Sequence, residues 1–97
     1  MLKLSKINTN MSERYYLEGL CHARLEDFEK ASDKYKKALD LNSQKIDINY
    51  EYGQVLFALN RLRDAREQFT LSAKKEYKKP MALYYMGYIS QFIEEHD

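Results

Sequence analysis

The sequence predicts an all-α fold, an α-α superhelix of two helical hairpins followed by a fifth helix. The only three glycines, Gly19, Gly53 and Gly87, are each separated by 34 residues, which is typical of a repeated supersecondary unit. Apolar residues recur at three-and-four spacing, as they do on one face of an amphipathic helix. Three glycines and one proline also supply too few turn residues for a sheet protein.

The first hairpin is expected over residues 11–24 and 28–41. Residues 1–10 are expected to form a flexible tail. Asn10 would then be the N-cap of the first helix, and Glu13 would complete a capping box. A tight turn separates the two helices.

The second hairpin is expected over residues 46–58 and 62–76, joined by a short turn at Asn60. The connection from the first hairpin runs through Asn42 and Ser43. Asn and Ser between periodic segments are typical of loops.

A fifth helix is expected over residues 80–95, because Pro80 suits a first helical turn, where its missing N–H costs nothing. A domain over residues 11–97 follows from these elements. Its units are about 12–45, about 46–79 and a partial unit at 80–97.

Size, composition and charge fit one small soluble domain. The 97 residues are 44% hydrophobic and 32% charged, so the chain can bury a core and keep a polar surface. A net charge of +1 disfavours a broad nucleic-acid-binding surface. No segment has the apolar length of a signal peptide or a membrane span, so we expect a cytoplasmic protein without a membrane anchor.

Small and aromatic residues recur at fixed positions of the 34-residue unit. Counted from Ser12, the first unit has Gly19 at position 8, Ala31 at position 20, Tyr35 at position 24 and Ala38 at position 27. This pattern resembles the tetratricopeptide repeat, a helix-turn-helix unit of the same length. Small residues let two helices approach closely, and the aromatic ring fills the space beside them.

The later units keep much of this pattern. The second, counted from Ile46, has Gly53, Ala65 and Phe69, and the third, counted from Pro80, has Gly87 before it stops after one helix. The resemblance therefore covers about residues 12–95. It implies a module that binds proteins, in the role of an adaptor, a scaffold or a chaperone-like factor.

Positions 5, 9 and 12 of each unit form a second helix stripe, about 100° from the packing stripe. In the family that the chain resembles, this stripe lines a concave groove. Tyrosine occupies position 5 in every unit, which suits a peptide or helix with apolar anchors. The alternative is that these rings fill space between hairpins. The predicted groove residues are Tyr16, Leu20, Tyr50, Gln54, Phe57, Tyr84 and Tyr88.

The fifth helix is apolar nearly all round, so it requires cover on every side. Its face with Ala82, Met86, Ile89 and Ile93 would normally meet a second helix of the third unit. Either a longer natural chain or a second copy would cover it. A homodimer through this face is therefore the alternative function, self-assembly.

Few residues suggest catalysis or metal binding. Cys21 is the single cysteine, which excludes an internal disulfide, and it diverges by 100° from its neighbour His22 on a helix. Glu18 and His22 lack a third ligand for a metal ion. We expect no enzyme activity and no cofactor.

Two basic clusters, at residues 34–37 and 74–79, interleave lysine with tyrosine. Both lie on second helices of a unit, and acidic residues occur nearby. A solvated convex helix face is the favoured interpretation. Contact with RNA through these patches is a minor alternative.

Overall fold

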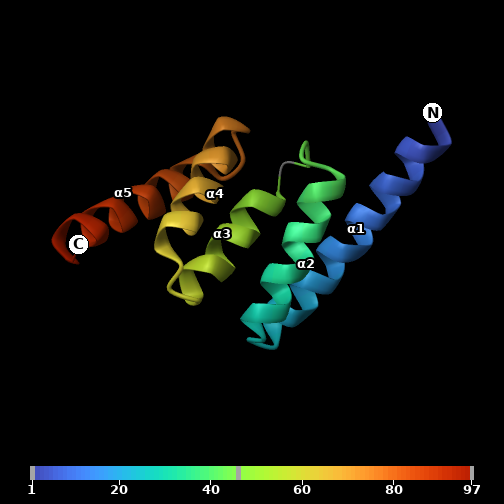
Figure 1. Ribbon diagram of the computed structural model, residues 1–97. Helices are drawn as coiled ribbons and strands as arrows, with labels where there is room; N and C mark the ends of the chain where they lie inside the picture. Colours follow the sequence, from blue (N-terminus) through green and yellow to red (C-terminus); the bar gives the residue numbers. More distant parts are fainter. Residues whose placement is uncertain (1, 46, 97) are drawn as a thin grey trace.

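The computed structural model describes residues 2–45 and 47–96, with side chains from residue 10 onward. Within these residues the chain forms five helices and no strand, which confirms the predicted all-α superhelix. The helices follow one another in chain order along a molecule of 49 × 28 × 19 Å (Figure 1). They are α1 (Leu2–Arg24), α2 (Phe28–Leu41), α3 (Ile48–Ala58), α4 (Leu62–Lys74) and α5 (Lys79–His96).

Helix α1 begins nine residues earlier than the sequence predicted. The expected tail at residues 1–10 is helical from Leu2 on, and Asn10 lies inside the helix, so the predicted helix start and capping box are wrong. No glycine or proline precedes Gly19, and without a breaker a helix extends at little cost per residue. Met1 lies outside the described residues.

The other helix boundaries agree with the sequence to within two residues. The predicted range 28–41 is found unchanged in α2. Helix α3 starts at Ile48 after Asp47 as its N-cap, and Ile46, where the third helix was expected to begin, lies outside the described residues. Predicted boundaries usually carry errors of this size.

Three helices end in the same backbone motif, in which one residue adopts a left-handed conformation. Glu26, Asn60 and Glu76 have φ values of 61°, 63° and 60°. After each of them the next amide reaches back five residues, as in Asp27 N–H to the His22 carbonyl at 2.8 Å. This pattern is a Schellman motif, which satisfies otherwise unpaired carbonyls at a helix end. Two of the three motifs, at Glu26 and Asn60, are 34 residues apart, so the repeat includes its turns.

The two hairpins close around glycine, as the sequence predicted. A Cβ added to Gly19 would lie 2.6 Å from the Tyr35 ring, and one added to Gly53 would lie 2.9 Å from the Phe69 ring. Both rings are fully buried. The third glycine differs, because an added Cβ on Gly87 would meet no described atom within 4 Å. The prediction of close packing at all three glycines is therefore wrong for Gly87.

The core consists of two apolar clusters along the superhelix. The first lies within and beside the α1–α2 hairpin and includes Tyr35 and Ile48. The second joins α3 and α4 to α5 through Phe69, Ala82 and Ile89. Each helix thus packs on its neighbours in the sequence, which is the arrangement of a solenoid.

Candidate protein-binding surface

The three tyrosines at position 5 do not share one environment. Tyr16 is 8% exposed and Tyr50 is 4% exposed, whereas Tyr84 is 72% exposed. The next hairpin or helix covers the first two rings, but nothing among the described residues follows α5. The space-filling alternative therefore holds for Tyr16 and Tyr50, and of the three rings only Tyr84 is exposed.

Tyr50 is the centre of an aromatic cluster between α3, α4 and α5. Its ring makes edge contacts with Phe69, Tyr77 and Tyr85 at centroid distances of 5.7, 6.2 and 6.3 Å. Phe69 and Tyr85 stack at 4.4 Å with their planes 2° apart. Edge-to-face and stacked contacts of this kind are the orientations that aromatic rings prefer, and they add to the stability of the cluster.

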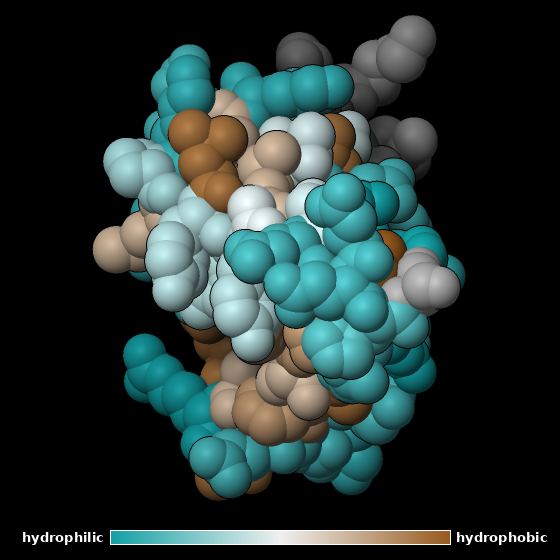
Figure 2. Space-filling view, turned by 90° about the vertical axis from the view of Figure 1, so that its left-hand side faces the viewer, coloured by the Kyte–Doolittle hydropathy of each residue, from teal (hydrophilic) through white to brown (hydrophobic). Residues whose placement is uncertain are grey.

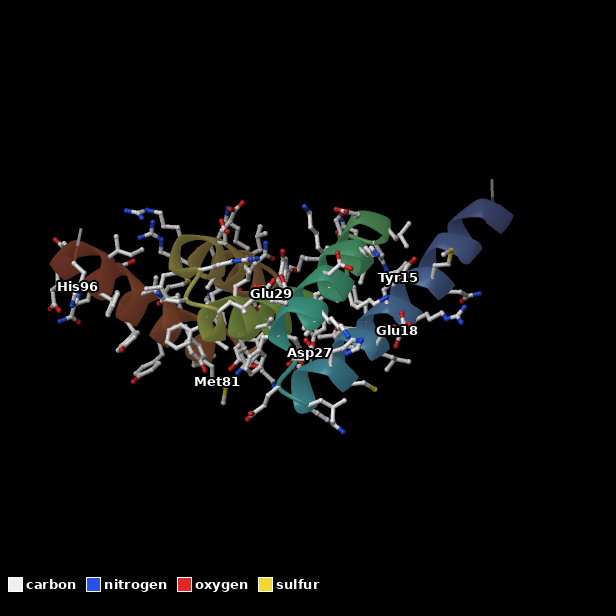
Figure 3. All side chains as sticks on the ribbon, turned by 60° about the horizontal axis from the view of Figure 1, so that its bottom comes forward. Tyr15, Glu18, Asp27, Glu29, Met81 and His96 are labelled. Atoms are coloured by element: carbon white, nitrogen blue, oxygen red, sulfur yellow. The ribbon has the colours of Figure 1, made fainter. Side chains whose placement is uncertain are left out.

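A pocket of about 410 Å³ opens above the aromatic cluster. The Tyr50 hydroxyl donates to the Met81 sulfur at 3.5 Å and accepts from the Gln54 amide at 3.3 Å. Met81 projects from the start of α5 beside α3 (Figure 3). Because aromatic rings, a proline and a methionine line most of it, the pocket suits a hydrophobic side chain. Its lining residues are Tyr50, Pro80, Met81, Tyr84 and Tyr85.

The other predicted groove residues lie on either side of this pocket. Leu20 and Gln54 are half-buried. Phe57 packs on Tyr85 at 5.3 Å and on Tyr88 at 5.8 Å, and Tyr88 is 50% exposed. The structure therefore brings Gln54, Phe57 and Tyr88 near the pocket and leaves Leu20 in the first cluster.

Sequence reasoning missed Pro80, Met81 and Tyr85 as pocket residues. The assignment to positions 5, 9 and 12 considered one stripe, whereas the pocket is formed where α5 crosses α3. A signal was available, because Met81, Tyr84, Tyr85 and Tyr88 recur at three-and-four spacing on one side of the fifth helix.

Lysines cover the faces of the two buried position-5 rings. The Lys45 ammonium lies 5.1 Å from the Tyr16 centroid, and the Lys78 ammonium lies 5.0 Å from the Tyr50 centroid. These distances are in the range of cation–π attraction. The buried tyrosines thus already have partners within the chain.

Acidic groups on the same side of α3 have mixed environments. Burial raises the pKa of Glu51, although Lys78 nearby acts in the opposite direction. Lys45 pairs with Glu13 at 2.9 Å and with Asp47 at 3.6 Å. The hydrogen bond to Glu13 raises the pKa of Lys45. One lysine therefore pairs with both Glu13 and Asp47.

The predicted oligomerisation face is not available on the surface. Ala82 and Ile89 are fully buried, and Met86 and Ile93 are half-buried against the same cluster. Helix α4 covers this side of α5 with Ala65, Phe69 and Ala73. The expected position of that face is corrected, because a solenoid helix packs on the helix that precedes it.

The apolar residues that α5 does expose lie on its other sides. Figure 2 views the end of the molecule that α5 forms, and apolar and intermediate side chains lie there among hydrophilic ones. The large hydrophobic side chains exposed on α5 are Met81, Leu83, Tyr84 and Tyr88.

The first basic cluster is engaged within the chain. Lys34 and Lys37 lie 5.5 and 5.7 Å from the Tyr15 ring centroid. Lys34 also pairs with Glu18 at 3.7 Å, and Tyr15 and Glu18 both lie on α1 beside α2 (Figure 3). These contacts support the interpretation as a solvated helix face.

The residues that the sequence considered for catalysis or metal binding, Glu18, Cys21 and His22, all lie on α1. Cys21 is exposed, and Glu18 is held by Lys34. Within residues 2–45 and 47–96, no three His, Cys, Asp or Glu side chains gather as metal ligands would. No helix in the described part of the chain has the length and hydropathy needed to cross a bilayer.

A comparison with models of known protein families gives a match. The model of the family described as "Anaphase-promoting complex, cyclosome, subunit 3" matches residues 2–70. These residues include the first hairpin, α3 and most of α4, which is more than half of the chain. No curated protein matches the sequence.

Proposed function

Because the chain belongs to the family of anaphase-promoting complex, cyclosome, subunit 3, a family of tetratricopeptide-like repeats, we propose that it docks a segment of another protein in the α3–α5 pocket. Such repeat families generally mediate protein–protein interaction and are typically not enzymes. The proposed ligand is a peptide or helix with an apolar anchor.

One observation carries this proposal, the exposure of Tyr84 above a fixed aromatic floor. The Tyr84 ring is 72% exposed and lies 6.2 Å from Tyr85, which is stacked on Phe69. An exposed aromatic ring with few rotatable bonds loses little conformational entropy on binding. Clusters of this composition are frequent among residues that dominate binding energy.

The name of the family supplies a first partner to test. We propose that the chain acts in the cytoplasm as an adaptor or scaffold, and that its partners are other subunits of an anaphase-promoting complex. A chaperone-like role would use the same pocket with a wider range of peptides.

Affinity purification of the tagged full chain from its own cells tests both parts. Tyr84→Ala should reduce the recovered partner at least about tenfold, if the ring contributes as interface tyrosines commonly do. Leu25→Ala is the matched control, because Leu25 is 77% exposed but lies in the α1–α2 turn. Equal recovery with both variants would contradict the pocket, and recovery of no subunit of such a complex would contradict the partner.

A further inference from the structure

The end of α4 contacts the connection between α2 and α3 through one lysine. The Lys75 ammonium donates to the carbonyl oxygens of Ser43 and Lys45, at 2.5 and 3.1 Å. It also donates to the side-chain oxygen of Asn49 at 2.6 Å. An ammonium group has three N–H donors, so these three oxygens use all of them. The connection and the end of α4 lie at the same edge of the molecule (Figure 1), and Lys75 fixes the first to the second.

The network around Lys75 continues into the second hairpin. Asn49 is 2% exposed, and its amide nitrogen donates to the Gln68 side-chain oxygen at 2.8 Å. Burial lowers the pKa of Lys75, and Asp47 nearby acts to raise it. Burying a charged amine costs free energy, which its oxygen partners offset. Without the Lys75 ammonium, the buried oxygen of Asn49 would lose its donor.

The first unit has other side chains at the positions of Asn49 and Lys75. Thirty-four residues before them stand Tyr15 and Leu41, which line one pocket between α1 and α2. An aromatic and an aliphatic residue in the first unit thus correspond to an amide and an amine in the second. A buried polar network specifies one arrangement of its elements when every member is satisfied. The network is therefore a property of the junction between the hairpins, not of the repeat.

Lys45 carries the contact on to the first hairpin. Its carbonyl oxygen accepts from Lys75, whereas its ammonium pairs with Glu13 of α1 at 2.9 Å. The same ammonium lies 5.1 Å from the centroid of the Tyr16 ring. Lys45 is thus held at its backbone by the second hairpin and at its side chain by the first.

From these contacts we propose that Lys75 and Lys45 form a relay that fixes the orientation of the first hairpin relative to the second. Loss of the charge at Lys75 frees the connection, and Lys45 then loses its place beside Glu13. Lys75 acts through Lys45 and is a positioning residue for α1. Apolar burial still supplies most of the stability of the interface, and the relay selects one orientation. The pocket beside Tyr84 is formed by α3 and α5, so this inference does not depend on it.

Trace acetylation of the full chain tests the relay, because it measures each lysine amine separately. A small amount of acetic anhydride labels neutral, accessible amines, and mass spectrometry gives the rate at each lysine. Lys45 is the reporter, and Lys34 is the internal control. Their side chains are 23% and 26% exposed, and each pairs with a carboxylate of α1. Lys34 lies on α2, within the first hairpin, so the relay does not include it.

The first variant is Lys75→Met, which keeps the length of the side chain and removes the ammonium. Lys45 should be acetylated at least about threefold faster in it, because an amine released from a carboxylate is more often neutral and less covered. The rate at Lys34 should not change. Lys74→Met, which removes an exposed charge one position earlier, should change neither rate. Tm should fall by about 4 °C or more in Lys75→Met, and circular dichroism should show that its helices remain.

A second pair of variants tests the relay from its other end without touching a buried group. Coupling between two sites is reciprocal, so Glu13→Gln should raise the acetylation rate at Lys75 at least about twofold. Glu18→Gln is the matched control, because Glu13 and Glu18 are 49% and 43% exposed on the same helix and Glu18 pairs with Lys34. It should leave the rate at Lys75 unchanged.

Three results would overturn the inference. One is a wild-type rate at Lys45 in Lys75→Met. Another is equal acceleration of Lys34 and Lys45, because the substitution would then have loosened the whole first hairpin. The third is an equal rate at Lys75 in Glu13→Gln and Glu18→Gln, which would contradict the coupling even if Lys75→Met failed to fold.

Discussion

The effect of a glycine depends on what lies above it. Gly19 and Gly53 occupy the same helix position as Gly87, and the sequence treats all three alike. In the folded chain the first two admit a ring and the third faces open space. Glycine therefore permits a close ring contact at two positions and makes none at the third. Substitution by alanine at each position distinguishes these two environments.

Gly53→Ala should destabilise the chain. The added Cβ would lie 2.9 Å from the Phe69 ring, which is fully buried and stacked on Tyr85. Overpacking of this kind costs about 1–3 kcal/mol, more than the helix propensity gained from alanine. Urea unfolding followed by circular dichroism measures the change, with Gly87→Ala as the control. A stabilised Gly53→Ala would mean that the ring moves aside freely.

Glu51→Gln should stabilise the chain at pH 7, by an amount that shrinks as the pH falls. Burial raises the pKa of Glu51, so the native state binds its proton more tightly than the unfolded state. The charged form then destabilises the fold above the native pKa, and protonation removes that cost at lower pH. Lys78 and Arg24 act to lower the pKa of Glu51, and Asp47 acts to raise it further.

Thermal unfolding of wild type and Glu51→Gln at about pH 7 and about pH 4 measures this difference. If Glu51→Gln has a lower Tm than the wild type at pH 7, the attraction of the Glu51 carboxylate to Lys78 outweighs the cost of burying it.

At the scale of elements, the places where helices end depend more on how the next helix must pack than on which residue types occupy the turns. The turns after α1, α3 and α4 place Glu26, Asn60 and Glu76 in the left-handed region, where glycine is the usual residue. Asparagine tolerates this conformation well, but glutamate does not. The turns therefore form because the next helix must pack back on the previous one.

Glu26→Gly should stabilise the chain by up to about 1 kcal/mol. The φ of Glu26 is 61°, a conformation that costs a residue with Cβ about 1–2 kcal/mol, partly offset by the extra freedom of glycine in the unfolded state. Chemical denaturation of this variant beside Glu29→Gly, an exposed helical site, provides the comparison. Destabilisation at both sites would show that Glu26 makes a compensating interaction.

At the scale of the whole molecule, the hairpins are joined in a line, so stability depends on the contacts between neighbours. Helices α2 and α3 bring the two hairpins together, and α4 carries α5. The exposed ion pair of Arg61 with Glu29 at 3.3 Å also joins the two hairpins, but exposed pairs contribute little. Apolar burial between hairpins therefore holds the superhelix together.

Ile48→Ala tests this dependence at the interface between the hairpins. Ile48 starts α3 and is fully buried in the cluster of Tyr35 and Val55. Removing three carbons there should lower the free energy of unfolding by about 2–5 kcal/mol. If the chain is one cooperative unit, near- and far-ultraviolet dichroism will shift together. If only one of the two dichroism signals shifts, the hairpins unfold separately.

Much of the fold could be predicted from the sequence, because the signals that set it are local. The 34-residue spacing of glycine and the three-and-four apolar pattern predicted five helices, and four of the five have boundaries within two residues of the prediction. The start of α1 was missed, since a helix that meets no breaker continues past its last recognisable cap. Of the exposed aromatic residues on α5, Tyr84 and Tyr88 were named from the sequence, but the pocket residues Met81 and Tyr85 were not.

The sequence by itself determined which segments are helical, where they turn, and that small residues mark close contact between helices. Only the tertiary structure decided which side of each helix is covered. The repeat places Tyr16, Tyr50 and Tyr84 alike, but burial depends on which helices pack against each ring, so within the described residues the first two rings are core and the third is exposed. For the same reason Gly87 is open and the face with Ala82 and Ile89 is closed. Periodicity is encoded along a chain, whereas exposure is set by neighbours in space.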